Sequence, residues 1–162
     1  MSESYDVAII GAGPGGYVAA IRCAQLGMNT VCIDEWKNIK GKASLGGTCL
    51  NVGCIPSKAL LESSENYYQA KYKFSHHGVM VDNVSADVPV MIARKDKIVN
   101  TFTAGIASLF KKNKVKSIHG KGTLLKRELS ADTWIINVSD NGTTETIQAK
   151  HVILATGSNP RP

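Results

Sequence analysis

The first 34 residues limit the fold of this chain more than any other segment. Residues 5–10 form a continuous apolar run that leads directly into Gly11-Ala12-Gly13-Pro14-Gly15-Gly16. A helical pattern follows, Gly27 provides a helix stop, and residues 30–34 form a second apolar run. This order predicts a strand–helix–strand unit with two parallel, buried strands. The apolar face of the predicted helix comprises Ala19, Ala20, Cys23, Ala24 and Leu26.

The glycine spacing in this unit is typical of a nucleotide phosphate site. Gly11 permits a tight turn, Gly13 lets a pyrophosphate approach the backbone, and Gly16 lets the helix pack closely on the strand. The phosphates would lie at the helix N-terminus. Asp34 ends the second strand, where a carboxylate can accept hydrogen bonds from a ribose, and Glu35 beside it could share or replace that role. A solvated strand end is the alternative for Glu35.

Two longer helices are predicted after this unit, with no internal repeat or low-complexity segment. One carries the cysteine pair and runs to about Phe74, and the other begins near Asp87, a plausible N-cap, with Pro89 in its first turn. Apolar residues follow helical spacing along the second helix, and we expect them to lie in the core. They are Met91, Ile92, Ile98, Val99, Phe102, Ile106, Leu109 and Phe110.

Short strands complete the predicted fold. Residues 116–120, 122–126, 133–139 and 143–148 are expected to be strands, with Asp140-Asn141-Gly142 as a turn between the last two. They suggest a small antiparallel β crossover. Residues 151–155 then predict a further, separate strand in the parallel sheet. The fold class is therefore α/β, a Rossmann-like domain with a central parallel sheet and a small antiparallel β crossover.

Composition excludes several classes of protein. The 162 residues fit one globular unit, and no apolar run approaches the roughly 18–20 residues of a membrane span. The net charge of +6 suggests nucleic acid, but the lysines at 111–116 lie at a predicted helix end without interleaved aromatic residues, so we expect no nucleic-acid or membrane partner. Met1 stands a few residues before the first strand, which predicts a cytoplasmic protein.

The cysteines point to redox chemistry rather than to a metal. Cys49 and Cys54 lie five positions apart, whereas Cys23 and Cys32 lie in apolar segments where we expect small buried side chains, so no metal site is predicted. On a regular helix the Cα atoms of such a pair are roughly 8–9 Å apart, too far for a disulfide. The helix must therefore be irregular here, and Gly53 permits that. A structural disulfide, worth about 2 kcal/mol, is the alternative to a redox pair.

The segment Gly46-Gly47-Thr48-Cys49-Leu50-Asn51-Val52-Gly53-Cys54-Ile55-Pro56-Ser57-Lys58 resembles the redox-active segment of the flavin disulfide reductases. Its Ile-Pro-Ser-Lys ending is most similar to the dihydrolipoyl dehydrogenase branch, with mercuric and glutathione reductases as alternatives. Ala155-Thr156-Gly157-Ser158 resembles the turn with which this family touches its flavin nucleotide. The resemblance implies FAD as the cofactor and residues 1–162 as the N-terminal part of an FAD-binding domain.

The resemblance also implies roles for individual residues. Cys49 would exchange with a dithiol substrate, and Cys54 would face the flavin. Lys58 could stabilise a thiolate or the reduced flavin, although a solvated lysine is the alternative. Gly120 matches a position near the adenosine, and a simple strand-end turn is equally suited to it. The complete cofactor-binding set is Gly11, Gly13, Gly16, Asp34, Glu35, Gly46, Gly47, Thr48, Lys58, Gly120, Thr156, Gly157 and Ser158.

The implied activity is the FAD-dependent oxidation of dihydrolipoyl groups of 2-oxo acid dehydrogenase complexes or of the glycine cleavage system, with electrons passing to NAD. Lipoyl domains and a second copy of the full-length protein are the implied partners. No second Gly-x-Gly-x-x-Gly marks an NAD site, and no His-Pro pair marks a catalytic base, so His76, His77, His119 and His151 are expected at packing or surface positions. This chain alone is therefore expected not to complete turnover; an inactive FAD-binding module is the alternative. Residues 159–162 would lead toward an NAD-binding domain.

Overall fold

The computed structural model describes residues 3–158, and six strands within them form one sheet. The strands are β1 (Ser4–Ile10), β2 (Thr30–Asp34), β3 (Lys116–His119), β4 (Lys121–Glu128), β5 (Thr133–Asp140) and β6 (Thr143–Leu154). The helices are α1 (Pro14–Gln25), α2 (Gly47–Asn51), α3 (Cys54–Tyr72) and α4 (Val88–Lys112), with a 3-10 turn at Phe74–His77. The predictions for residues 1–2 and 159–162 lie outside the described residues.

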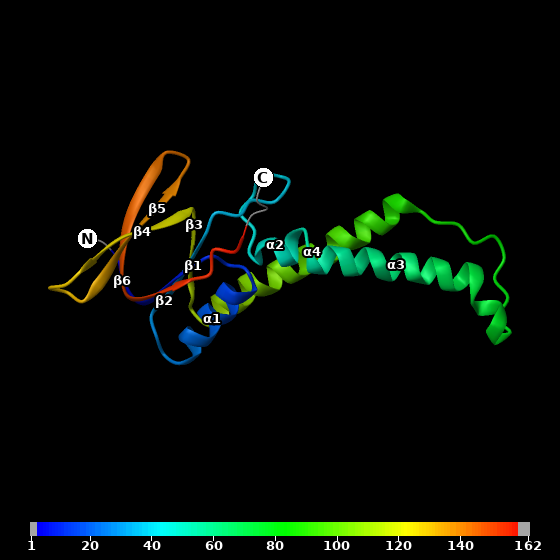
Figure 1. The fold of residues 1–162 in the computed structure, drawn as a ribbon, viewed down its shortest axis with the longest axis horizontal. Helices are drawn as coiled ribbons and strands as arrows, with labels where there is room; N and C mark the ends of the chain where they lie inside the picture. Colours follow the sequence, from blue (N-terminus) through cyan, green and yellow to red (C-terminus); the bar gives the residue numbers. More distant parts are fainter. Residues whose placement is uncertain (1–2, 159–162) are drawn as a thin grey trace.

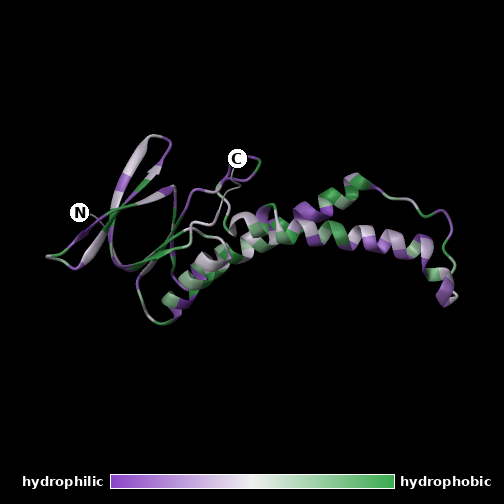
Figure 2. Ribbon diagram, viewed as in Figure 1, coloured by the Kyte–Doolittle hydropathy of each residue, from purple (hydrophilic) through white to green (hydrophobic). Residues whose placement is uncertain are grey.

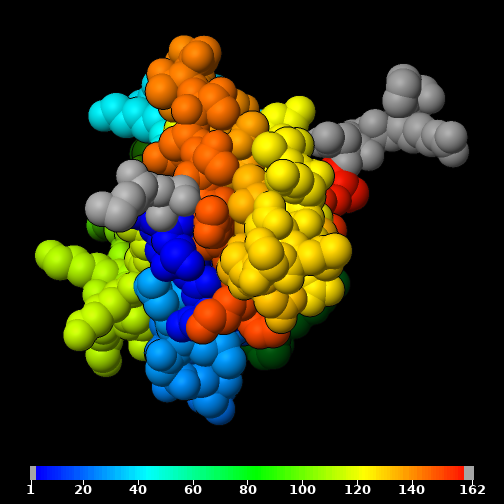
Figure 3. Space-filling view, turned by 90° about the vertical axis from the view of Figure 1, so that its left-hand side faces the viewer, coloured from blue at the N-terminus to red at the C-terminus, as the bar shows by residue number. Residues whose placement is uncertain are grey.

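The sheet has the order β3-β2-β1-β6-β5-β4 (Figure 1). The strands β3, β2, β1 and β6 pair in parallel, whereas β6, β5 and β4 pair antiparallel. Seen from the end opposite the helices, β4–β6 fill the front of the molecule in yellow and orange (Figure 3). The predicted α/β class, with a central parallel sheet and an antiparallel part, is confirmed.

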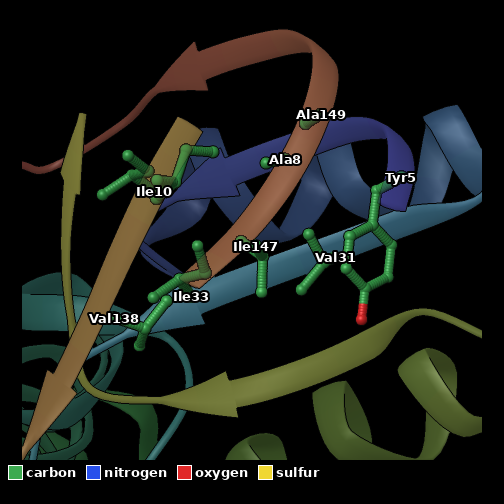
Figure 4. Close-up of a cluster of buried hydrophobic side chains, with 9 residues drawn as sticks. Tyr5, Ala8, Ile10, Val31, Ile33, Val138, Ile147 and Ala149 are labelled. Atoms are coloured by element: carbon green, nitrogen blue, oxygen red, sulfur yellow. The ribbon is translucent and has the colours of Figure 1, made fainter. Parts of the chain in front are cut away.

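The core lies on both faces of the parallel strands, because successive side chains of a strand point to opposite faces. In β2, Val31 and Ile33 join one buried cluster and Cys32 joins the other. The first cluster packs β1 and β2 against the antiparallel strands (Figure 4), and its members include Ala8, Ile10, Ile136, Val138, Ile147 and Ala149. The second packs the sheet against α1, α2 and α4 through Val7, Ile9, Ala20, Leu50, Ile106 and Phe110.

A single long strand, β6, replaces two strands that the sequence predicted. Residues 143–148 and 151–155 belong largely to a single strand, β6, which pairs antiparallel with β5 from Thr143 to Ala149 and parallel with β1 from Gln148 to Leu154. The prediction of a separate return strand is wrong, because a strand has two hydrogen-bonding edges and can serve a hairpin and a parallel pair in succession. The predicted turn is confirmed: Asn141 and Gly142 have positive φ angles of 47° and 82°.

Helices α3 and α4 form a long hairpin that extends away from the sheet (Figure 1). Asp87 caps α4 as predicted, because its Oδ1 accepts a hydrogen bond from the Val90 amide at 3.0 Å. Of the eight apolar residues expected in the core, however, only Ile106 and Phe110 are buried, while Phe102 is 53% exposed. Hydrophobic residues, green in Figure 2, are spread along both α3 and α4. Helical spacing shows which face is apolar, not whether a neighbour covers it.

No helix within residues 3–158 combines the length and the apolar character that a membrane crossing requires.

Candidate functional site

The first glycine loop is a backbone junction with no room for side chains. Gly11 has a φ of +106°, and a Cβ there would lie 2.1 Å from the Ala155 carbonyl oxygen. A Cβ on Gly16 would lie 1.7 Å from the carbonyl oxygen of Gly11. The close packing predicted for Gly16 is therefore real, but it brings the helix against the glycine loop more than against the strand.

The second glycine loop packs on the first. The Gly46 amide donates to the Ala12 carbonyl oxygen at 2.9 Å, and a Cβ on Gly47 would lie 2.7 Å from the Cα atom of Gly13. A Cβ on Gly13, in contrast, would meet nothing closer than 4.0 Å. The backbone of Gly13 is therefore not crowded at the N-terminus of α1, which is what a close approach of phosphates requires.

The carboxylate of Asp34 ties the end of β2 to the first glycine loop. Its Oδ2 accepts a hydrogen bond from the Ala12 amide at 2.5 Å, and its Oδ1 accepts one from the Trp36 amide at 2.7 Å. Since each carboxylate oxygen has two acceptor positions, both oxygens keep capacity for a ribose hydroxyl. Glu35 is exposed beside it.

A pocket of about 380 Å³ lies at the carboxyl ends of β1 and β2, where α/β sheets bind ligands. Seven predicted cofactor residues line it: Gly11, Asp34, Glu35, Gly120, Thr156, Gly157 and Ser158. Segments from the start, the middle and the end of the chain thus meet in one place. Size, open glycine backbone and carboxylates fit the nucleoside part of FAD.

Sequence reasoning missed four residues of this pocket, namely Ile10, Ile33, Lys121 and Gly122. Lys121 follows Gly120 directly, so adjacency was the available signal. Gly120 forms the strand-end turn considered for it, and its role near the adenosine stays a prediction. It joins β3 to β4 with a φ of +149°, where a Cβ would lie 2.8 Å from Val138 Cγ1, and it also lines the pocket.

The cysteine pair lies at a break between two helices, as its spacing predicted. Helix α2 ends at Asn51 and α3 begins at Cys54, and the intervening Val52 and Gly53 leave helical geometry. The Gly53 amide still donates to the Thr48 carbonyl oxygen at 2.8 Å, which closes the turn and brings the two cysteines together.

Cys49 and Cys54 are not joined by a disulfide in this structure. The pKa of the Cys49 thiol is raised, chiefly by its side-chain hydrogen bond with Cys54. Burial and charge repulsion from Cys54 raise it further by smaller amounts, whereas the nearby Lys58 ammonium lowers it. Cys49 therefore keeps its proton to higher pH than an isolated thiol. Cys54 is exposed, and Cys49 is half-buried.

The remaining predicted residues lie outside the nucleoside pocket. Gly13, Gly46, Gly47 and Thr48 lie at the contact of the two glycine loops, and Lys58 is an exposed residue of α3 one turn after Cys54. The Gly13–Gly47 contact therefore joins the loop that begins at the nucleoside pocket to the loop that leads into the cysteine pair.

Cys32 is buried as predicted, and burial followed by the charge of Asp34 raises its pKa to about 12. Cys23 is only half-buried. No cluster of metal-ligating side chains occurs within residues 3–158. His76, His77 and His151 are exposed, while His119 Nε2 lies 3.9 Å from Asp140 Oδ1.

A family model described as pyridine nucleotide-disulphide oxidoreductase matches residues 5–162. The chain belongs to this family. Among curated proteins it is 51% identical over 159 residues to dihydrolipoyl dehydrogenase 2, mitochondrial, of Arabidopsis thaliana, which aligns 98% of this chain with 29% of the relative. It is 49% identical over 163 residues to dihydrolipoyl dehydrogenase of Cupriavidus necator, covering 99% of this chain and 33% of the relative. Leghemoglobin reductase of Vigna unguiculata is 50% identical over 159 residues, covering 98% and 28%.

The family match confirms the resemblance read from the cysteine segment and the first glycine loop, and it identifies the chain as part of an oxidoreductase of the pyridine nucleotide-disulphide family. FAD and NAD(H) are the cofactors that the family implies. The chain spans between 28% and 33% of the length of these relatives. The individual site residues stay predictions, as does the cytoplasmic location, since some relatives carry the word mitochondrial in their names.

Proposed function

We propose that this chain supplies the FAD-binding segment and the redox dithiol of an NAD-linked dihydrolipoyl dehydrogenase. The observation that carries the proposal is the cysteine pair at the α2–α3 break, a few residues beyond the junction of Gly13 with Gly47. Thiols in that position can reach a flavin whose phosphates lie at the glycine loops. The names of the relatives favour dihydrolipoyl groups as the substrate class.

The thiol chemistry balances on the residues of this chain. A dihydrolipoyl thiolate attacks Cys49 Sγ of the oxidised pair, the Cys49–Cys54 bond breaks, and Cys54 leaves as a thiolate. The second lipoyl thiolate then attacks its own partner sulfur, which releases cyclic lipoyl disulfide and Cys49. Two electrons are then on the cysteine pair. The raised pKa of Cys49 supports these separate roles of the two cysteines, because Cys49 holds a proton that it shares with Cys54 in a hydrogen bond.

Bound FAD would accept this electron pair and pass it as hydride to NAD. Gly11, Gly13 and Gly16 shape the phosphate end of its site, and Gly46, Gly47 and Thr48 close it from the other side. Asp34, Glu35, Gly120 and the turn Thr156-Gly157-Ser158 form the nucleoside end. Lys58 stands close enough to the thiols to lower the pKa of Cys49, and its cation could stabilise negative charge there.

The names of the relatives also support a proposal about partners. Lipoyl domains of 2-oxo acid dehydrogenase complexes, or of the glycine cleavage system, would present the dithiol, and the full-length protein would be a homodimer. Within this sequence no second glycine fingerprint and no His-Pro pair occurs, so we expect no NADH production from the 162-residue chain alone. An FAD-binding module without activity is the second candidate, and a mercuric or glutathione reductase is the third.

Steady-state kinetics of this chain placed within a full-length dihydrolipoyl dehydrogenase test the proposal. Dihydrolipoamide with NAD should yield NADH, and Cys49→Ser and Cys54→Ser should each abolish that activity while FAD stays bound. A control variant, Cys23→Ser, should keep it. Faster reduction of glutathione disulfide or of mercuric ion would move the protein to another branch of the family. Undiminished activity in Cys54→Ser would refute the redox role of the pair.

A further inference from the structure

A second pocket, of about 440 Å³, lies between the loop after β2 and the first half of α4. It shares no lining residue with the nucleoside pocket. Its walls come from the loop at 36–44, the helix break at Asn51 and Val52, and α4 between Ile92 and Asn100. In Figure 1 this loop is the cyan segment that rises beside α2. None of the roles described above uses this pocket.

The loop wall is held by its own hydrogen bonds. Asn38 Oδ1 accepts from the amides of Lys40 and Lys42 at 3.0 and 3.1 Å, and the Asn38 amide donates to the Lys42 carbonyl oxygen at 2.8 Å. The Ser44 amide closes the loop onto the Trp36 carbonyl oxygen at 3.1 Å. Side chains on this loop are therefore presented from an ordered backbone.

Asn51 fastens the loop to helix α2. Its Oδ1 accepts a hydrogen bond from Ser44 Oγ at 2.8 Å, and its Nδ2 donates to the carbonyl oxygens of Leu45 and Gly47 at 3.2 and 2.9 Å. The pocket thus has a fixed base, so a ligand would meet a largely preformed site.

The charge around the pocket is positive. Lys37 pairs with Asp140 at 3.2 Å from outside the pocket, and Lys95 pairs with its neighbour Asp96. Within residues 3–158, Lys40 forms no ion pair. The positive charges of Lys37, Lys40 and Lys95 therefore outnumber the negative charges of Asp96 and Asp140. The Lys95 side chain is only 21% exposed, whereas that of Asp96 is 58% exposed and shared with solvent.

Apolar side chains accompany these cations. Ile92 and Val99 lie on the α4 wall, and Val52 is 63% exposed at the helix break. The Trp36 ring forms part of the loop wall, and its Nε1–H is buried without a hydrogen-bond acceptor among the described residues. Basic groups beside uncovered apolar surface are complementary to a molecule with an anionic head and an apolar body.

We propose that this pocket binds a small amphipathic carboxylate, with the carboxylate between Lys40 and Lys95 and the apolar chain along Ile92, Val52 and Val99. The proposal is independent of the redox function. It concerns a separate pocket and needs neither FAD nor the cysteine pair.

Equilibrium dialysis of radiolabelled octanoate tests it, on the protein at its natural length. We expect saturable binding that unlabelled octanoate displaces, that octylammonium does not displace, and that octanamide displaces at least about tenfold less well, a difference of about 1.4 kcal/mol. Raising the salt concentration should weaken it. Absence of saturable binding, or equal displacement by octanamide, would overturn the proposal.

Variants locate the site. Lys40→Gln and Lys95→Gln should each weaken octanoate binding several-fold, and Val99→Asp should abolish it. Lys112→Gln is the matched control, because Lys112 is an exposed lysine at the far end of the same helix. Binding that survives Val99→Asp, or that falls equally in Lys112→Gln, would place the octanoate elsewhere and contradict the assignment. Circular dichroism shows whether each variant keeps its fold.

Discussion

Gly47 lies with its backbone directly against that of Gly13: a Cβ on Gly47 would come within 2.7 Å of the Gly13 Cα atom, whereas a Cβ on Gly13 would meet only the Gly47 Cα atom, at an ordinary contact distance of 4.0 Å. The two glycines of this contact therefore serve different purposes. Gly47 lets two loops touch, and Gly13 leaves room for a ligand.

Alanine at these two positions should separate folding from cofactor binding. Gly47→Ala should lower the free energy of unfolding by roughly 2–4 kcal/mol, because it adds a clash to a positive φ of 59°. Gly13→Ala should leave stability within about 1 kcal/mol and reduce FAD affinity, since its methyl group occupies the proposed phosphate space. Urea denaturation and flavin titration measure both. Equal stability of the two variants would contradict this reading.

Asp34 and Glu35 can be distinguished by the affinity for adenosine monophosphate. Asp34 holds the Ala12 and Trp36 amides on its two oxygens, and Asp34→Asn replaces one of these oxygens with an NH2 donor, so one amide loses its acceptor and binding should weaken about tenfold or more. Glu35→Gln should change the affinity by less than about threefold, because no hydrogen bond of Glu35 shapes the pocket. Calorimetric titration gives both values, and a larger effect for Glu35→Gln would transfer the ribose role to that residue.

Removal of Cys54 should make the Cys49 thiol more acidic. The pKa of Cys49 is raised chiefly by its hydrogen bond with Cys54, and the Lys58 ammonium opposes that shift. In Cys54→Ala the backbone hydrogen bond of residue 54 and the Lys58 charge, which both lower the pKa of Cys49, remain beside burial, so alkylation of Cys49 should reach half its maximal rate at lower pH than in the parent. Mass spectrometry after iodoacetamide treatment follows it. Cys23→Ala is the control, and an unchanged profile in Cys54→Ala would exclude the thiol–thiol interaction.

Cys32 should make stability depend on pH in alkaline solution. Its folded pKa of about 12 lies above the ordinary value of 9.0, so its contribution is complete below about pH 9 and is lost as the pH rises toward 12. The stability difference between the parent and Cys32→Ala should fall by roughly 2 kcal/mol between about pH 8 and about pH 10.5. Urea denaturation at both values measures it, and a constant difference would show that the buried thiol ionises normally.

The sequence allowed prediction where local rules decide the structure. The bounds of β2 followed from its short apolar run, and the Asp87 cap, the Asn141-Gly142 turn and the helix break at the cysteines followed from capping, turn chemistry and disulfide geometry. These features depend on a few neighbouring residues, and each has a strong steric or hydrogen-bonding cause.

Prediction failed where segments distant in the sequence determine the burial of a residue or the pairing of a strand. The exposure of Phe102 depends on what packs against α4, and the continuity of β6 depends on which strands lie at its two edges. The pocket residue Lys121 is brought to Asp34 by sheet order rather than by any local pattern. The contact of Gly13 with Gly47 likewise could not be read from the two glycine motifs separately.

The visible absorption spectrum of the flavin-loaded protein tests the central claim most directly, namely that this chain places a dithiol against FAD. The account predicts bound flavin and, after addition of dihydrolipoamide without NAD, a new band at longer wavelength that is absent in Cys54→Ser. Gly13→Ala should lose the flavin while keeping its fold. A parent protein that binds no flavin, or a long-wavelength band that persists in Cys54→Ser, would contradict the account.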